Sequence, residues 1–361
     1  SHPAPDVSTA AFALATDDVM HLTMRGSDAS RDRMAKLDQA LIDEGIAKHP
    51  KKDEIGVENG VCIGVDLFQG SFFCAHSPKL SLLIASIIEI LRRGECSPKA
   101  YHAVIGVAQR MFLLNRPLFS ILDRYYAFTR LTPELEVRPL GSEDVAELVM
   151  ILGLTPYFEA DLRREWAPML TATDASSEFG FGACVASCTP TVARQVGRLA
   201  EVRGAYVRLT RDGGPTDEPE RPRLGEPHRL RLSKRAFKDV ISLRHRYKAH
   251  AGSLEASGLL LLLRWISRTA RHHSRRVPIL VDAQAVPGAV AKGRTSASSF
   301  KRDMRRIAAV TLASNILPAY VYIPSEENPA DAPSRGVLRV RGKMGKRLSK
   351  LPVRKCITKP S

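Results

Sequence analysis

The hydrophobic pattern of this chain changes near residue 165, and this change limits the folds that the chain can adopt. Before that point, apolar residues recur with helical spacing in four segments: 78–92, 98–114, 117–128 and 143–152. Ser-Pro pairs open the first two segments, as expected for a helix cap followed by the first helical residue. We therefore expect a largely helical region here.

After residue 165 the apolar runs become short or alternating, which is typical of strands. Predicted strands cover residues 169–173, 179–186, 205–209, 277–281 and 320–323, and predicted helices cover residues 253–270 and 299–313. Nearer the start of the chain, residues 11–24 form two predicted strands that bend at Asp17-Asp18, followed by a helix at 29–46 and a strand at 61–67. The chain as a whole is predicted to be mixed α/β.

Composition and length indicate ordinary folded protein. The 361 residues are 44% hydrophobic and 25% charged, and they suffice for two or three domains. The six cysteines lack paired metal-binding or redox spacing, which indicates reduced thiols. No apolar run is long enough for a membrane span, and the first residues lack a signal-peptide pattern. We expect an intracellular location, with nucleus and cytoplasm both open, no membrane partner and an undetermined oligomeric state.

The chain is strongly basic, because 54 Lys and Arg against 38 Asp and Glu give a net charge of +16. A charge excess of this size predicts a polyanionic partner such as duplex nucleic acid. Residues 336–361 hold nine basic residues and no acidic one, a pattern that equally suits a nuclear-import signal. The candidate nucleic-acid contacts are Lys301, Arg302, Arg305, Arg306, Arg335, Lys346 and Arg347.

Four carboxylates occupy positions suited to a metal site. Asp174 and Asp282 each follow a predicted strand, Glu255 lies in the first turn of a predicted helix, and Asp331 lies in a predicted loop at 328–335. If the two strands are neighbours, their terminal carboxylates emerge together, and oxygen ligands suit Mg²⁺ or Mn²⁺. Taken singly, each acid also has an ordinary role in a turn or beside a helix dipole.

Residues 169–335 resemble the ribonuclease H domain of a retroelement reverse transcriptase, most like DIRS-type elements. The matching stretches are Ala172-Thr173-Asp174-Ala175-Ser176, Phe179-Gly180-Phe181-Gly182-Ala183, Leu254-Glu255-Ala256, Val281-Asp282 and Asn328-Pro329-Ala330-Asp331-Ala332-Pro333-Ser334-Arg335. The resemblance implies that Asp174, Glu255, Asp282 and Asp331 bind two metal ions and cut the RNA strand of an RNA–DNA hybrid. The sequence departs from the family in a longer segment between Asp174 and Glu255, and in Ala283, where many relatives carry Asn.

The N-terminal part resembles the end of a polymerase palm followed by a helical thumb. Asp17-Asp18 resembles the metal-binding Asp pair of the palm, although Ala15 stands where an aromatic residue is usual. Ile63-Gly64-Val65 resembles the primer-grip strand. The implied domains are an incomplete palm at 1–75, a thumb and connection at 76–165, a ribonuclease H-like domain at 166–336 and a basic tail at 337–361. Fingers are missing from this chain, so we expect no polymerase activity from it alone.

Two functions remain open from the sequence. The first is a metal-dependent endoribonuclease of the ribonuclease H type within an RNA-directed DNA polymerase. The second is an inactive remnant that binds nucleic acid without cutting it. The presence of all four carboxylates favours the enzyme.

Overall fold

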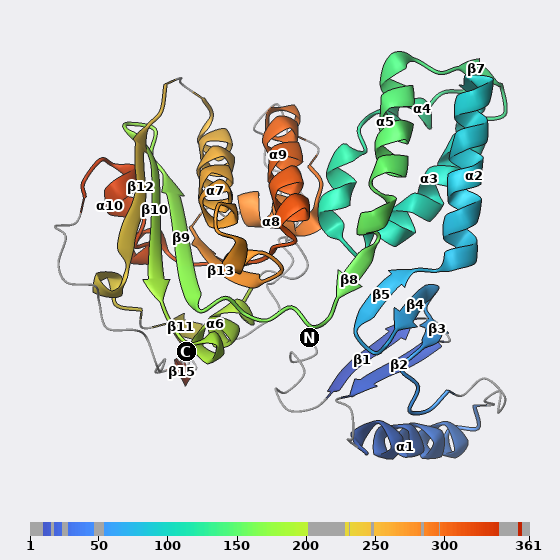
Figure 1. Cartoon of the computed structure of the whole chain (residues 1–361), viewed down its shortest axis with the longest axis horizontal. Coiled ribbons are helices and arrows are strands. Elements are labelled where there is room, and N and C mark those ends of the chain that lie inside the picture. Colours follow the sequence, from blue (N-terminus) through green and yellow to red (C-terminus); the bar gives the residue numbers. More distant parts are fainter. Residues whose placement is uncertain are drawn as a thin grey trace, which may run out of the picture. The chain divides into compact units, whose positions relative to one another are not determined.

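The computed structural model describes residues 10–15, 18–23, 28–46, 54–200, 228–230, 232–246, 249–282, 285–295, 297–338 and 353–355. The chain forms two compact units (Figure 1). Unit 1 comprises Ser1–Asn115 and Phe128–Arg163, and unit 2 comprises Arg116–Ala127 and Arg164–Ser361. The fold class is mixed α/β, as the sequence predicts.

Unit 1 contains two antiparallel sheets near the start of the chain. Strands β1 (Ala10–Ala15) and β2 (Asp18–Thr23) pair as predicted, and α1 (Ala29–Asp43) follows them. A four-stranded sheet has the order β3 (Gly60–Cys62), β4 (Val65–Phe68), β5 (Phe72–Ala75) and β8 (Glu159–Asp161). The single strand predicted at 61–67 is wrong, because Ile63 and Gly64 have φ of 54° and 73° and reverse the chain in a two-residue turn.

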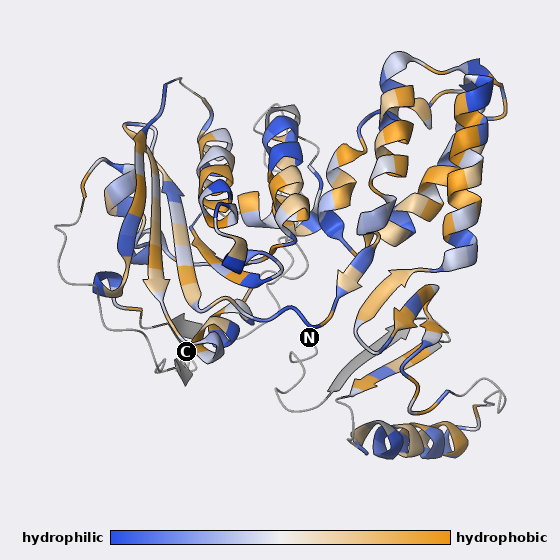
Figure 2. Cartoon of the chain, in the orientation of Figure 1, coloured by the Kyte–Doolittle hydropathy of each residue, from blue (hydrophilic) through white to orange (hydrophobic). Residues whose placement is uncertain are grey.

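Three long helices complete unit 1: α2 (Ser77–Arg93), α3 (Pro98–Phe112) and α5 (Ser142–Gly153). Each buries apolar residues, and α2 and α5 are mostly orange in Figure 2. The Ser97 side chain caps α3 by accepting from the backbone N–H of Ala100. A short strand pair, β6 (Glu95–Cys96) and β7 (Arg138–Pro139), lies between these helices in the chain, and the 3₁₀ turn η3 (Thr155–Tyr157) follows α5.

The continuous helix predicted at 117–128 is wrong. This segment forms a 3₁₀ helix η2 (Arg116–Ile121) and, after a break, the short helix α4 (Arg124–Phe128). Leu118 and Ile121 are both buried, and the three-residue period of a 3₁₀ helix brings them to one face. Except for Phe128, the segment belongs to unit 2, where η2 contacts α8 (Ala285–Lys292) and α9 (Ser298–Ser314).

Unit 2 is built on a five-stranded mixed sheet. The strands are β9 (Met169–Ala175), β10 (Gly180–Ser187), β12 (Lys238–Arg244), β13 (Arg276–Val281) and β14 (Leu317–Tyr322), in the order β12-β10-β9-β13-β14. Strand β10 runs antiparallel to β9 and β12, and β13 runs parallel to β9 and β14. The predicted strand at 205–209 lies outside the described residues.

Helices cover both faces of this sheet. Helices α7 (Ala251–Ser267), α8 and α9 enclose one core with alternate residues of β13 such as Ile279 and Val281. Helix α6 (Pro190–Gly197) encloses the other core with Leu280 and the β9 residues Leu170 and Ala172. Hydrophobic residues on both sides of β9 and β13 explain why these strands read as continuous apolar runs.

The remaining elements of unit 2 are short. They are the 3₁₀ turns η4 (Lys234–Ala236), η5 (Ala270–His272) and η6 (Ser325–Glu327), the helix α10 (Asp331–Ser334), and the strand pair of β11 (His228–Leu230) and β15 (Val353–Lys355).

Candidate metal centre

The register between β9 and β13 brings two of the predicted carboxylates together. Leu280 pairs with Ala172 in the parallel ladder, so two residues further along Asp282 lies beside Asp174. The two strands are therefore neighbours, which was the condition for their carboxylates to emerge together. Asp282 follows β13 as expected, whereas Asp174 is the second-last residue of β9 rather than the residue after it.

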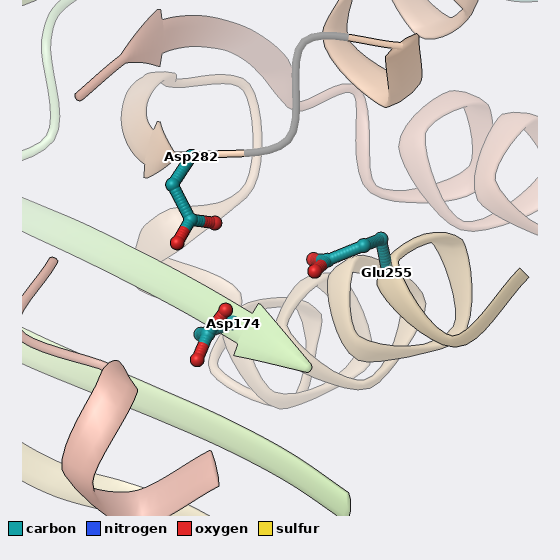
Figure 3. A group of neighbouring side chains, drawn as sticks. All are labelled: Asp174, Glu255 and Asp282. Atoms are coloured by element: carbon teal, nitrogen blue, oxygen red, sulfur yellow. The ribbon is translucent and has the colours of Figure 1, made fainter. Parts of the chain in front are cut away.

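The third carboxylate comes from the helix that covers the sheet. Glu255 is the fifth residue of α7 and so lies in its second turn, not in the first turn predicted from the sequence, because the helix begins earlier, at Ala251. Ligand oxygens of Asp174, Glu255 and Asp282 all lie within 4.8 Å of one another. Figure 3 shows the three side chains converging from β9, α7 and the end of β13.

These side chains line an open pocket of about 300 Å³. Its other lining residues are Ala175, Ser176, Ser177, Glu178, Ser325, Asp331 and Arg335. The first four belong to the end of β9 and the turn into β10, and the last three follow β14. All of the predicted carboxylates of unit 2 therefore face one pocket, together with a single arginine.

Burial and mutual repulsion oppose ionisation of two of the carboxylates. Burial, partly offset by a hydrogen bond from Ser334, and the charges of Asp282 and Asp331 raise the pKa of Asp174 to about 6. Burial and then the charges of Asp174 and Asp282 raise the pKa of Glu255 to about 9. A cation between these oxygens would reverse both effects, because it favours the charged forms.

Asp282 provides a specific test of whether a metal fits. Its Oδ2 accepts a hydrogen bond from Ser325, but its Oδ1 is buried and has no hydrogen-bond partner among the residues that the structure describes. A buried acceptor without a partner is rare and costly in a folded protein. A cation would satisfy this oxygen, and an all-oxygen donor set suits a hard divalent ion such as Mg²⁺ or Mn²⁺. The residues fit such a metal.

The fourth predicted ligand, Asp331, shares the pocket but not the close group. It is the first residue of α10, so the predicted loop is a short helix there. Its Oδ1 accepts a 2.9 Å hydrogen bond from Nε of Arg335, one helical turn later. Arg335, predicted from the sequence as a nucleic-acid contact, thus pairs with a carboxylate of the pocket.

Most of the basic residues predicted on α9 form ion pairs with nearby aspartates. Lys301 and Arg305 both form ion pairs with Asp123 of the segment after η2. Arg306 lies 3.8 Å from Asp303, while Arg302 is exposed and has no ion pair within the described part of the chain. Hydrophilic residues gather along part of α9 in Figure 2.

Several predicted site residues fall where the structure gives no side chain. Asp17, Lys346 and Arg347 lie outside the described residues, and only the backbone of Asp18 is described, at the start of β2. Their predicted roles in metal and nucleic-acid binding therefore stay predictions.

The sequence interpretation did not single out two serines that contact the carboxylates. Ser334 Oγ lies 2.5 Å from Oδ2 of Asp174, and Ser325 Oγ lies 2.5 Å from Oδ2 of Asp282. Ser325 precedes and Ser334 follows Asp331 in the chain. Their position near a predicted ligand was the only sequence signal for these contacts.

Comparisons with known proteins give matches only among solved structures. No protein-family model matches the sequence, and no curated protein matches it. Among solved structures, foamy viral protease-reverse transcriptase dRH in complex with double-stranded DNA has 13% identity and a TM-score of 0.35, over 86% of this chain and 45% of that one. Foamy viral protease-reverse transcriptase in complex with RNA/DNA hybrid has 11% identity and a TM-score of 0.34, over 87% and 56%.

This chain spans about half the length of those two structures. Their similarity is weak, so we base the function on the geometry of the carboxylates. Among the described residues, no helix combines the length and the apolar character needed to cross a membrane.

Proposed function

We propose that unit 2 is a metal-dependent nuclease whose carboxylates Asp174, Glu255 and Asp282 hold divalent cations for phosphodiester hydrolysis. The observation that carries this proposal is the convergence of the three carboxylates within 4.8 Å, with Oδ1 of Asp282 buried and without a hydrogen-bond partner in the described part of the chain. Structural carboxylates are normally separated or paired with cations, so this arrangement is costly unless a metal is present.

The protein's own groups position the reaction. Asp174 and Asp282 are fixed by adjacent strands, and Glu255 is fixed by a helix packed on those strands, so their spacing is rigid. Two divalent ions held by Asp174, Glu255 and Asp282 would supply activation of a water and stabilisation of the leaving oxygen of a phosphodiester. Asp331 adds a carboxylate to the same pocket, and Arg335 holds that carboxylate in place.

The proposed substrate is the RNA strand of an RNA–DNA hybrid, and the proposed whole protein is a retroelement reverse transcriptase. Support for the substrate class comes from the motif around Asp331 and from the net charge of +16, which favours binding to a polyanion. The ions proposed for the site are Mg²⁺ or Mn²⁺.

The test is cleavage of a labelled RNA–DNA hybrid by the full chain with Mg²⁺ or Mn²⁺. Asp174→Asn and Asp282→Asn each remove one ligand charge, and we expect cleavage to fall by at least about 100-fold. Hybrid binding without metal should change little. Glu327→Gln is the matched control, because it removes the same charge from an exposed position outside the pocket.

The outcomes separate the two functions considered from the sequence. Cleavage by the wild type that both Asp variants lose supports the nuclease. Hybrid binding without cleavage by the wild type at any metal concentration would reject it and favour a binding-only remnant. Equal cleavage by the wild type and both Asp variants would show that the active carboxylates lie elsewhere.

A further inference from the structure

One segment of the chain contacts carboxylates from two different strands. It runs from η6 to the end of α10. The Ser325 hydroxyl donates a hydrogen bond to Asp282, and the Ser334 hydroxyl donates one to Asp174. Asp331 lies between them in the chain. The same ten-residue stretch therefore touches or supplies three carboxylates of the pocket.

Ser334 is enclosed by the structure around it. Its side chain is fully buried, and α10 lies so close to β10 that a Cβ on Gly182 would be 2.4 Å from the Ser334 backbone nitrogen. Asn328 ties the start of this segment to β9, because its Nδ2 donates to the carbonyl of Thr173, the residue before Asp174. Ser334 thus approaches Asp174 from a rigid support.

The Ser334 hydroxyl has one proton and two acceptors within reach. Oδ2 of Asp174 lies at 2.5 Å, and the backbone carbonyl of Asp331 lies at 2.8 Å. When Asp174 is ionised, the charged carboxylate is the stronger acceptor. The hydroxyl then fixes one oxygen of Asp174.

Ser325 acts on Asp282 in the same way but from an exposed position. It donates to Oδ2, whereas Oδ1 has no partner. In each aspartate one oxygen is therefore held by a serine. Hydrogen bonds of this kind orient ligand carboxylates before the metal arrives.

We propose that Ser325 and Ser334 are positioning residues that orient Asp282 and Asp174 for metal binding by donating to the oxygen of each carboxylate that does not ligate the metal. This inference rests on the proposed function and deepens it. It predicts that loss of either hydroxyl weakens metal binding while the fold is retained.

The test measures Mn²⁺ affinity directly on the full chain, from the free Mn²⁺ signal in electron paramagnetic resonance. Loss of a group that hydrogen-bonds to a metal ligand typically changes metal affinity by about 10- to 100-fold. We expect Ser334→Ala to raise the Mn²⁺ dissociation constant within that range. Ser242→Ala is the matched control, because the Ser242 hydroxyl also donates to α10, at the Pro333 carbonyl, but contacts no carboxylate.

Ser325 allows a comparison that does not depend on packing, because its side chain is exposed. Ser325→Thr keeps the hydroxyl, and Ser325→Val removes it at similar size. The Thr variant should bind Mn²⁺ like the wild type, and the Val variant should bind at least about 10-fold more weakly. In hybrid cleavage at subsaturating metal, added Mn²⁺ should restore kcat in the Val variant with KM for the hybrid unchanged.

Three results would overturn the inference. Wild-type Mn²⁺ affinity in both Ser334→Ala and Ser325→Val would show that the hydroxyls do not orient the ligands. An equal loss in Ser242→Ala would show that docking of α10 alone matters. Absence of Mn²⁺ binding by the wild type would reject the proposed function itself. If Asp282→Asn loses Mn²⁺ binding but both serine variants keep it, only the positioning role is rejected.

Discussion

At the scale of single residues, the pocket concentrates negative charge that the protein alone does not neutralise. Glu255 lies beside Asp174 and Asp282, and burial and their charges raise its pKa to about 9. In the unfolded chain this group has a pKa of 4.5. Without metal, Glu255 is therefore protonated at neutral pH in the folded state, whereas it is ionised in the unfolded state.

The sign of the pH effect follows from this difference. A folded pKa above the unfolded pKa gives stability that is fully present below pH 4.5 and is lost as the pH rises towards 9. We expect the metal-free wild type to lose stability between pH 5 and pH 8. Glu255→Gln removes the titration, so the variant should gain roughly 2–4 kcal/mol relative to wild type over this range.

The measurement is chemical denaturation of both proteins in a chelator at pH 5 and pH 8, followed by a signal from unit 2. Glu326→Gln serves as the control, because it removes an exposed carboxylate nearby and should leave the pH dependence unchanged. A wild type whose stability does not depend on Glu255 between these pH values would contradict the electrostatic account of the pocket.

At the scale of elements, a close contact between α10 and β10 places the segment that carries Asp331 and Ser334. Gly182 lies opposite Asp174 in the β9–β10 ladder. A Cβ there would lie 2.4 Å from the Ala330 carbonyl and from the Ser334 nitrogen, both of which are backbone atoms. Only glycine leaves room for α10 to lie against the sheet at this position.

Gly182→Ala should therefore displace α10. We expect a loss of about 1–3 kcal/mol in unfolding free energy, as is typical of overpacking, together with weaker Mn²⁺ binding. Gly106→Ala on α3 is the control, because a Cβ there meets no atom within 4 Å and alanine favours a helix by about 0.5–1 kcal/mol. Gly182→Ala with wild-type stability and metal affinity would contradict the role given to this contact.

Sequence patterns predicted the elements that carry strong periodicity. The strands that carry Asp174 and precede Asp282 were predicted from their apolar residues, but their pairing was only a condition in the sequence interpretation. Strand β12 was missed because its residues Lys238, Asp239 and Arg244 make an edge strand polar. The serine contacts were not predicted, although both serines lie near Asp331 in the sequence, because the contacts depend on how closely α10 approaches the sheet.

At the scale of the whole molecule, one of the two compact units includes a segment from outside the predicted ribonuclease H-like domain. Residues 116–127, in the predicted thumb, belong to the same compact unit as the sheet of unit 2. Leu118 in this segment is fully buried, and Arg116 donates to the carbonyl of Ala291 in α8. Unit 2 is therefore assembled from two separate pieces of chain.

A fragment that begins at residue 164 should be less stable than unit 2 in the full chain, because it lacks the apolar residues of η2. Adding a synthetic peptide of residues 116–127 should raise its melting temperature in a concentration-dependent way. The same peptide with Leu118→Ala should have a much weaker effect, since that leucine contributes about 2–5 kcal/mol when buried. An unchanged melting temperature with the native peptide would show that the segment is dispensable.

The central claim is that Asp174, Glu255 and Asp282 form a divalent-metal centre, and a crystal of the full chain soaked with Mn²⁺ tests it most directly. We predict an anomalous peak in the pocket within about 2.5 Å of Oδ1 of Asp282 and of an oxygen of Asp174. The peak should disappear in Asp282→Asn crystals. Well-ordered carboxylates with no peak between them at saturating Mn²⁺ would contradict the account.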